Sequence, residues 1–265
     1  MAKIKGMLLT LGFFIAVIIF LGFALIISNS FKSSRERVSD YIVFEKARVL
    51  DESTQEGFRN IFDKVSGITI VKGSTISFTE ELPNGNDIKF RNNLSRFNNF
   101  TNSSYNININ TSLSDDLALW IRPHDIKYYH VDFGDDIIKV QPRTFNFNKY
   151  RVDIVTDKVL DGTSCSGGGG SSKLDVTARG ASGTSCNSNT VQNFKLYDNT
   201  DVLLAYVNIG NDILTIDSET KINVTTNIVS LNDLGKEVDI KTDDNALTIN
   251  LSEYGFFKKS AIRVV

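Results

Sequence analysis

The sequence predicts an N-terminal transmembrane and stalk α-helix followed by a mainly-β, sandwich-like head. Three features of the 265-residue chain support this prediction: an uncharged apolar run near its start, an amphipathic segment behind that run, and a long series of short alternating segments. Alternation of apolar and polar residues is the mark of strands, whereas apolar residues at spacings of three and four indicate a helix. The length allows one or two domains beyond the helix.

The apolar run extends from Met7 to Ile27 and reads MLLTLGFFIAVIIFLGFALII. A helix of this length spans about 31 Å, at about 1.5 Å per residue, which matches the hydrocarbon core of a bilayer. The alternative is a cleaved secretory signal, with Ser28-Asn29-Ser30 as the small-residue cleavage site. Signals normally have an apolar region of about 7–15 residues. The greater length favours a retained membrane anchor over residues 7–30.

Cations lie on both sides of this anchor, so their number alone does not set its orientation. The tail over residues 1–6 is too short to fold, whereas the long C-terminal part contains both cysteines of the chain and six sequons for N-glycosylation. The sequons begin at Asn93, Asn99, Asn102, Asn110, Asn223 and Asn250. We expect the N-terminus inside the cell and the head outside. Because Asn, Ser and Thr are common in this chain, the alternative is that some sequons are accidental.

Residues 31–66 predict an amphipathic helical stalk, because apolar residues recur at helical spacing among charged ones. The apolar positions thin out over Asp51–Gly57, where we expect an interruption, with Ser53 or Thr54 capping a second helix. The apolar stripe of such a stalk needs a partner. Either the head of the same chain or a neighbouring subunit would supply it.

From residue 67 to residue 265 the pattern changes to short strands with turn residues between them, at spacings of about 8–12 residues. Lys72-Gly73-Ser74 predicts a hairpin, and Ile88–Phe100 predicts a short helix. The head divides into two subdomains if the Gly/Ser-rich stretch 161–172 is a linker. We favour one continuous β head, because the two cysteines bridge that stretch.

Cys165 and Cys186 follow two copies of the motif Gly-Thr-Ser, at Gly162 and Gly183. We expect a disulfide that pins a flexible tip around Gly167–Gly170 and contributes about 3 kcal/mol. Two cysteines without a nearby histidine do not complete a tetrahedral metal site.

The sequence offers no set of residues for catalysis, and we expect neither an enzyme nor a cofactor. The glycine run lacks the Gly-Lys-Ser/Thr ending of a phosphate-binding loop. His124 and His130 would lie about 20 Å apart on a strand, so they could not act together, and we expect an ordinary edge-of-strand role. The acidic turn at Asp132, Asp135 and Asp136 leaves calcium as the alternative to a plain turn. A net charge of −2 does not favour nucleic acid as a partner.

The first residues, Lys3-Ile4-Lys5-Gly6-Met7-Leu8-Leu9-Thr10-Leu11, resemble the start of archaeal type IV pilin-like and archaellin-like precursors. In those proteins a short basic leader ends in glycine, and the apolar helix that follows packs at the centre of a filament. The resemblance implies cleavage between Gly6 and Met7. It departs from the bacterial pattern at Leu11, where pilins commonly have glutamate.

We therefore expect a membrane-anchored cell-surface structural protein, a pilin-like or surface-filament subunit that assembles through its N-terminal helix. Its partners would be the lipid bilayer, further copies of the chain and covalent glycans. The alternative is a monomeric anchored adhesin or an extracytoplasmic receptor for a glycan or protein. A stripe of exposed side chains at Val38, Ile42, Val49 and Phe62 would favour assembly. A concave pocket lined by aromatic residues would favour recognition.

Overall fold

The computed structural model describes residues 2–105, 108–111, 117–122, 125–131, 136–143, 147–170, 173–230, 238–251 and 256–265. Side chains are described for these residues except those at 2–16, 36, 39, 105, 147 and 230. The chain separates into two compact units, Met1–Glu52 and Ser53–Val265.

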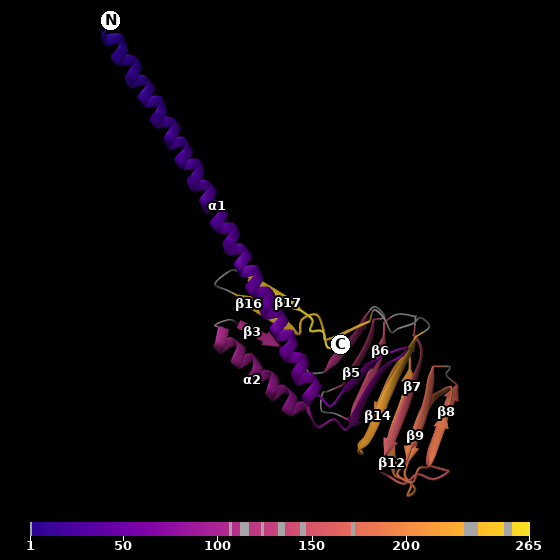
Figure 1. Cartoon of the computed structure of the whole chain (residues 1–265). Helices are drawn as coiled ribbons and strands as arrows, with labels where there is room; N and C mark the ends of the chain where they lie inside the picture. The colour runs from indigo at the N-terminus through magenta and orange to yellow at the C-terminus, as the bar shows by residue number, and fades with distance from the viewer. Residues whose placement is uncertain are drawn as a thin grey trace. The chain divides into compact units, whose positions relative to one another are not determined.

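The helix α1 runs without a break from Ala2 to Val65 (Figure 1). It confirms a helix over the predicted anchor and stalk. The expected interruption over Asp51–Gly57 is wrong: Thr54 is buried inside the continuous helix and does not start a new one. No proline occurs in this segment, and a single glycine within a helix costs only about 1 kcal/mol relative to alanine, so Gly57 does not break it.

In the second unit, the last turns of α1 pack on a second helix, α2 (Asp87–Tyr105). Phe58 and Phe62 are fully buried and meet Phe90 of α2 edge to face, at ring distances of 5.9 and 6.4 Å. Edge-to-face pairs stabilise such a contact beyond the area they bury. The short helix predicted at Ile88–Phe100 is thereby confirmed and extended.

The remaining chain forms three sheets (Figure 1). The first has six strands in the order β1-β2-β14-β7-β9-β10, with bounds Thr69–Lys72, Ile76–Leu82, Ile222–Ser230, Phe147–Thr156, Leu174–Arg179 and Ser185–Ser188. The predicted hairpin is confirmed as β1 and β2, which pair antiparallel. β7 and β9 pair in parallel, and between them the chain crosses to the second sheet to form β8.

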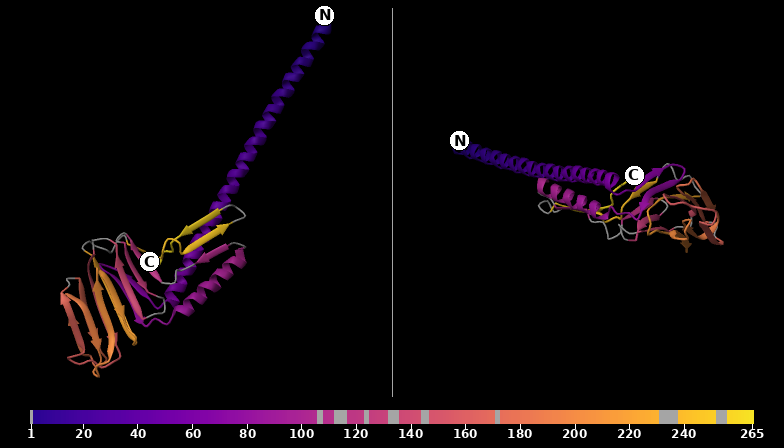
Figure 2. Two further views of the ribbon diagram at one scale, coloured as in Figure 1. Left: turned by 180° about the vertical axis from the view of Figure 1, so that it is seen from behind. Right: turned by 90° about the horizontal axis from the view of Figure 1, so that it is seen from below.

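The second sheet has eight strands in the order β15-β4-β5-β6-β13-β12-β11-β8. Their bounds are Asp239–Lys241, Ala118–Arg122, Ile126–His130, Ile137–Pro142, Ile213–Asp217, Leu203–Gly210, Val191–Tyr197 and Cys165–Gly170. The third sheet has the order β17-β16-β3, with bounds Phe256–Ser260, Leu247–Leu251 and Asn108–Thr111 (Figure 2).

Buried side chains of the two larger sheets contact each other. Phe78 of β2 stacks on Tyr128 of β5, with ring centroids 3.9 Å apart and planes 7° from parallel. Tyr150 of β7 donates a hydrogen bond to the carbonyl oxygen of Val140 in β6, at 3.3 Å. Burial raises the pKa of the Tyr150 phenol, so the hydroxyl stays protonated and remains a donor. The prediction of a mainly-β head is confirmed, in the sense that several sheets follow one long helix.

The glycine run does not form the flexible tip that we expected. Gly167 to Gly170 belong to β8, which pairs antiparallel with β11. A Cβ atom on Gly167 would lie 2.7 Å from the hydroxyl of Ser188, and one on Gly168 would lie 3.0 Å from Asn193. Gly169 has a φ of +72°, a conformation that glycine adopts without strain. Close approach of neighbouring strands, and not mobility, explains the run.

Candidate functional site

The N-terminal helix presents apolar side chains to its surroundings on all sides over Val17–Phe31. Among them Phe20, Phe23 and Ile26 are 75%, 60% and 66% exposed. A helix that is apolar all round is found in the core of a large protein or across a membrane. The helix contains one segment long and apolar enough to cross a bilayer. Gly6 and Met7, the predicted cleavage point, lie in the backbone of the same helix.

A narrow apolar stripe continues along α1 beyond this segment. It consists of Phe31, Val38, Ile42 and Val49, at spacings of seven, four and seven residues. At about 3.6 residues per turn, the four side chains fall within about 20° of one line along the helix. They are 71%, 57%, 59% and 46% exposed. We call these four residues the apolar stripe.

Part of the helix surface away from the apolar stripe is buried. Ala47 and Leu50 lie about 100–160° around the helix from it and are each only 5% exposed. Of the four positions predicted as an exposed seam, Val38, Ile42 and Val49 are exposed, whereas Phe62 is buried. The helix therefore leaves its apolar stripe unburied although it buries another face.

Charged residues of opposite sign border the apolar stripe. Arg35 and Lys46 lie on one side and Glu45 and Glu52 on the other, about 40–60° from the stripe. Arg48 lies further round and bonds both carboxylates, each at 2.6 Å. These bonds lower the pKa of Glu45 and raise that of Arg48. Such exposed pairs within a helix contribute little, so they leave the carboxylates able to exchange partners.

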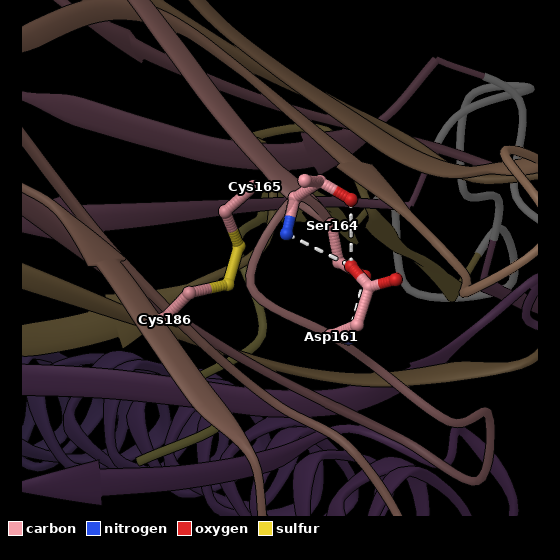
Figure 3. Close-up of a disulfide and its surroundings, with 5 residues drawn as sticks. Asp161, Ser164, Cys165 and Cys186 are labelled. Atoms are coloured by element: carbon pink, nitrogen blue, oxygen red, sulfur yellow. Dashed lines mark hydrogen bonds between the residues drawn. A yellow bond between two sulfur atoms is a disulfide. The ribbon is translucent and has the colours of Figure 1, made fainter.

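Cys165 and Cys186 form a disulfide, with their Cα atoms 6.2 Å apart (Figure 3). Cys165 opens β8 and Cys186 lies in β10, so the bond joins the end strand of the eight-stranded sheet to the end strand of the six-stranded sheet. The disulfide expected from the sequence is present, but it does not pin a hairpin tip. It holds two sheets together.

A hydrogen-bonded turn precedes Cys165. The hydroxyl of Ser164 donates to the carboxylate of Asp161 at 3.1 Å and accepts the backbone N–H of the same residue at 2.9 Å (Figure 3). Thr163 donates both its hydroxyl and its N–H to that carboxylate, and these bonds lower the pKa of Asp161. The turn fixes the direction in which the chain enters β8.

Five of the six sequon asparagines lie on α2 and the three-stranded sheet. Asn93, Asn99 and Asn102 belong to α2, Asn110 to β3 and Asn250 to β16, whereas Asn223 lies in β14. Three of these asparagines are exposed, namely Asn99, Asn110 and Asn223. The other three, Asn93, Asn102 and Asn250, are half-buried.

Amide side chains of α2 bind the free edge of β3. The Oδ1 atom of Asn102 accepts the N–H of Ile109 at 2.6 Å, and that of Asn98 accepts the N–H of Thr111 at 3.3 Å. A groove of about 430 Å³ lies along this contact, with Leu94 and Ile109 buried in its lining. Asparagines supply most of its polar lining, so it is not the aromatic pocket that would favour recognition.

The sequence analysis missed a buried polar cluster. Glu80 of β2 accepts hydrogen bonds from Tyr128 and from the amide of Asn84, and lies 2.6 Å from Nε2 of His130. Glu80 is 2% exposed and His130 is fully buried, so the expected edge-of-strand role is wrong for His130. Both residues lie on the buried face of their strands, in the alternating series Ile76, Phe78, Glu80 of β2 and Ile126, Tyr128, His130 of β5. That alternation was the signal that could have found them.

No group of three His, Cys, Asp or Glu residues that could hold a metal ion occurs in the described part of the chain. His124, Asp132 and Asp135 lie outside the described residues, so the calcium alternative at that turn stays a prediction. Comparison of the chain with protein-family models, curated proteins and solved structures finds no match.

Proposed function

We propose that this chain is a membrane-anchored cell-surface structural protein, a pilin-like or surface-filament subunit whose N-terminal helix assembles with further copies. The single observation that carries the proposal is the exposed apolar surface of α1, continued past the membrane segment by the apolar stripe. Exposed apolar surface of this extent marks a site of membrane or protein contact.

Lipid can cover the first part of this surface but not the second. Residues 7–27 have the length of a bilayer core. Val49 lies about 33 Å beyond Ile27 along the helix, at about 1.5 Å per residue, and Val38 about 17 Å. The headgroup region adds only about 5–8 Å on each side of the core. Most of the apolar stripe thus needs a protein partner, and we assign this role to the same stripe of another copy.

The charges beside the apolar stripe support parallel packing of the copies. In a parallel pair, one flank of a helix faces the opposite flank of its neighbour, as at the e and g positions of coiled coils. Lys46 of one copy would then lie at the height of Glu45 and Glu52 of the next. An antiparallel pair would bring like charges together. Parallel packing also agrees with a shared membrane, because all anchors then point the same way.

We infer that the head is a closed β-sandwich outside the cell. The stacking of Phe78 on Tyr128 and the disulfide between β8 and β10 support facing sheets. A disulfide persists in oxidising surroundings, which supports an extracellular location. The alternative function, an anchored adhesin or receptor, has less support, because the groove beside α2 lacks the aromatic lining typical of such sites.

The test uses full-length protein in detergent and two matched variants. Ile42→Glu places a charge in the apolar stripe, whereas Phe44→Glu places one at a more exposed position, 72% exposed, on a different side of the helix. We expect the wild type and Phe44→Glu to form oligomers by light scattering and cross-linking, and Ile42→Glu to lose them.

Equal assembly of the two variants would refute the stripe as the seam. Full-length protein that stays monomeric and soluble without detergent would refute the membrane anchor as well. Protease added to whole cells should cleave the head; if only lysed cells lose it, the proposed location is wrong.

A further inference from the structure

Four of the six sequons lie wholly among the described residues, and the structure divides them into two pairs. We infer that Asn99 and Asn223 are the sugar acceptors of this set, and that Asn93 and Asn102 stay unmodified because their amides hold the fold. The inference rests on the proposed function, since it requires an extracytoplasmic head. The sequons at Asn110 and Asn250 end at Ser112 and Ser252, outside the described residues, and are not assigned.

Asn99 and Asn223 present accessible amides. Asn99 is exposed on α2, next to Phe100, which is 62% exposed. Asn223 is exposed on the outward parity of β14, between the buried residues Ile222 and Val224. Neither side chain makes a hydrogen bond to the described part of the chain. A bulky, hydrated sugar at either position would project into solvent without displacing a contact.

Asn93 and Asn102 use their amides within the protein. The Nδ2 atom of Asn93 donates to the carbonyl oxygen of Lys89 at 2.8 Å. The Oδ1 atom of Asn102 accepts the N–H of Ile109 at 2.6 Å, and this bond joins α2 to the edge of β3. Both side chains are half-buried. A sugar on Nδ2 would have to extend from an amide whose plane these hydrogen bonds already fix, and the half-buried surroundings leave little room for it.

The modification is a group transfer with a defined balance. Nδ2 of the asparagine attacks the anomeric carbon of a sugar activated as a glycosyl phosphate. The new N–C bond forms as the C–O bond to the phosphate breaks, and Nδ2 releases one proton. The cell supplies the glycosyl phosphate and its transferase, so the chain contributes only the acceptor amide. The modified nitrogen keeps one hydrogen and gains a substituent that needs open space.

The experiment compares wild-type and variant full-length proteins, each purified from the native cells, by intact mass and by glycopeptide mapping. Asn99→Gln and Asn223→Gln should each remove one glycan mass. The matched variants Ser95→Ala and Ser104→Ala destroy the sequons of Asn93 and Asn102 while leaving both amides in place, and both serines are exposed. We expect these two variants to keep the full glycan mass of the wild type.

Sugar mapped to Asn93 or Asn102, or bare Asn99 and Asn223, would overturn the inference. Protease treatment of whole cells distinguishes a wrong choice of acceptor asparagines from a wrong location of the head. Bare acceptors on a head that the protease cleaves would refute only the choice of acceptors. Bare acceptors on a head that is protected until lysis would also refute the proposed location.

Discussion

The helix over residues 17–49 and the head over residues 53–265 treat apolar side chains in opposite ways. The helix exposes Phe20, Phe31 and Ile42, whereas the head buries Phe62 and Phe78 almost completely. Most of the large apolar side chains of the head find their partners within the chain. Most of the large apolar side chains described in the helix do not; under the proposed function, lipid or another copy would supply them. The same residue types are therefore packed within the chain in the head and are left exposed along the helix.

The largest expected difference in stability is between two phenylalanine substitutions, one in the head and one in the helix. Phe62→Ala removes a fully buried ring and its contact with Phe90, and should lower the free energy of unfolding by about 4 kcal/mol. Phe44→Ala removes an exposed ring and should change it by less than about 0.5 kcal/mol. Chemical denaturation of both variants measures the difference. Similar losses at both positions would remove the contrast between helix and head.

A second, smaller difference in stability is expected between substitutions of two neighbouring glutamates of β2. Glu80→Ala removes the buried carboxylate that accepts the Tyr128 hydroxyl and contacts His130, and should destabilise the head by about 3 kcal/mol. Glu81→Ala removes only an exposed contact to Lys221 at 3.0 Å, and should cost less than about 1 kcal/mol. Thermal unfolding followed by circular dichroism measures both. A Glu80→Ala head as stable as the wild type would show that the cluster does not help to join the sheets.

The smallest effect concerns Asp217 in β13. Burial, with the nearby charges of Asp136 and Glu219, raises the pKa of Asp217 above its usual 3.8. An acid whose pKa is raised by folding destabilises the folded state once the pH exceeds the pKa of the unfolded chain. Asp217→Asn should therefore raise the melting temperature slightly at pH 7 and leave it unchanged near pH 3. An equal shift at both pH values would exclude a charge effect.

The sequence predicted the features that local patterns determine. Apolar spacing predicted α1 and α2, and Lys72-Gly73-Ser74 predicted the first hairpin. The strand β8 was missed because its glycines have no side chains, and so give no alternation. The pairing of β2 with β14 could not be predicted either, because it joins Ile76–Leu82 to residues about 150 positions later in the chain. Local patterns carry no information about such partners.

The candidate site was predicted in part, for a similar reason. The spacing of Val38, Ile42 and Val49 was sufficient to predict an exposed stripe. Phe62 was predicted as part of that stripe, but at about 100° per residue it lies about 140° around the helix from Val49, and it is buried against Phe90 of α2. Helical spacing defines a face, but the neighbour that covers this face comes from another part of the chain.

The bond between Cys165 and Cys186 has a consequence for the solubility of the head. β8 and β10 are the outermost strands of their sheets on this side. Outermost strands are where sheets of separate molecules add to one another and aggregate. The covalent link keeps the ends of the two sheets close together, which leaves a foreign strand less room to pair with either. In oxidising surroundings, where the disulfide persists, heads at high local concentration should therefore aggregate less by strand addition between molecules.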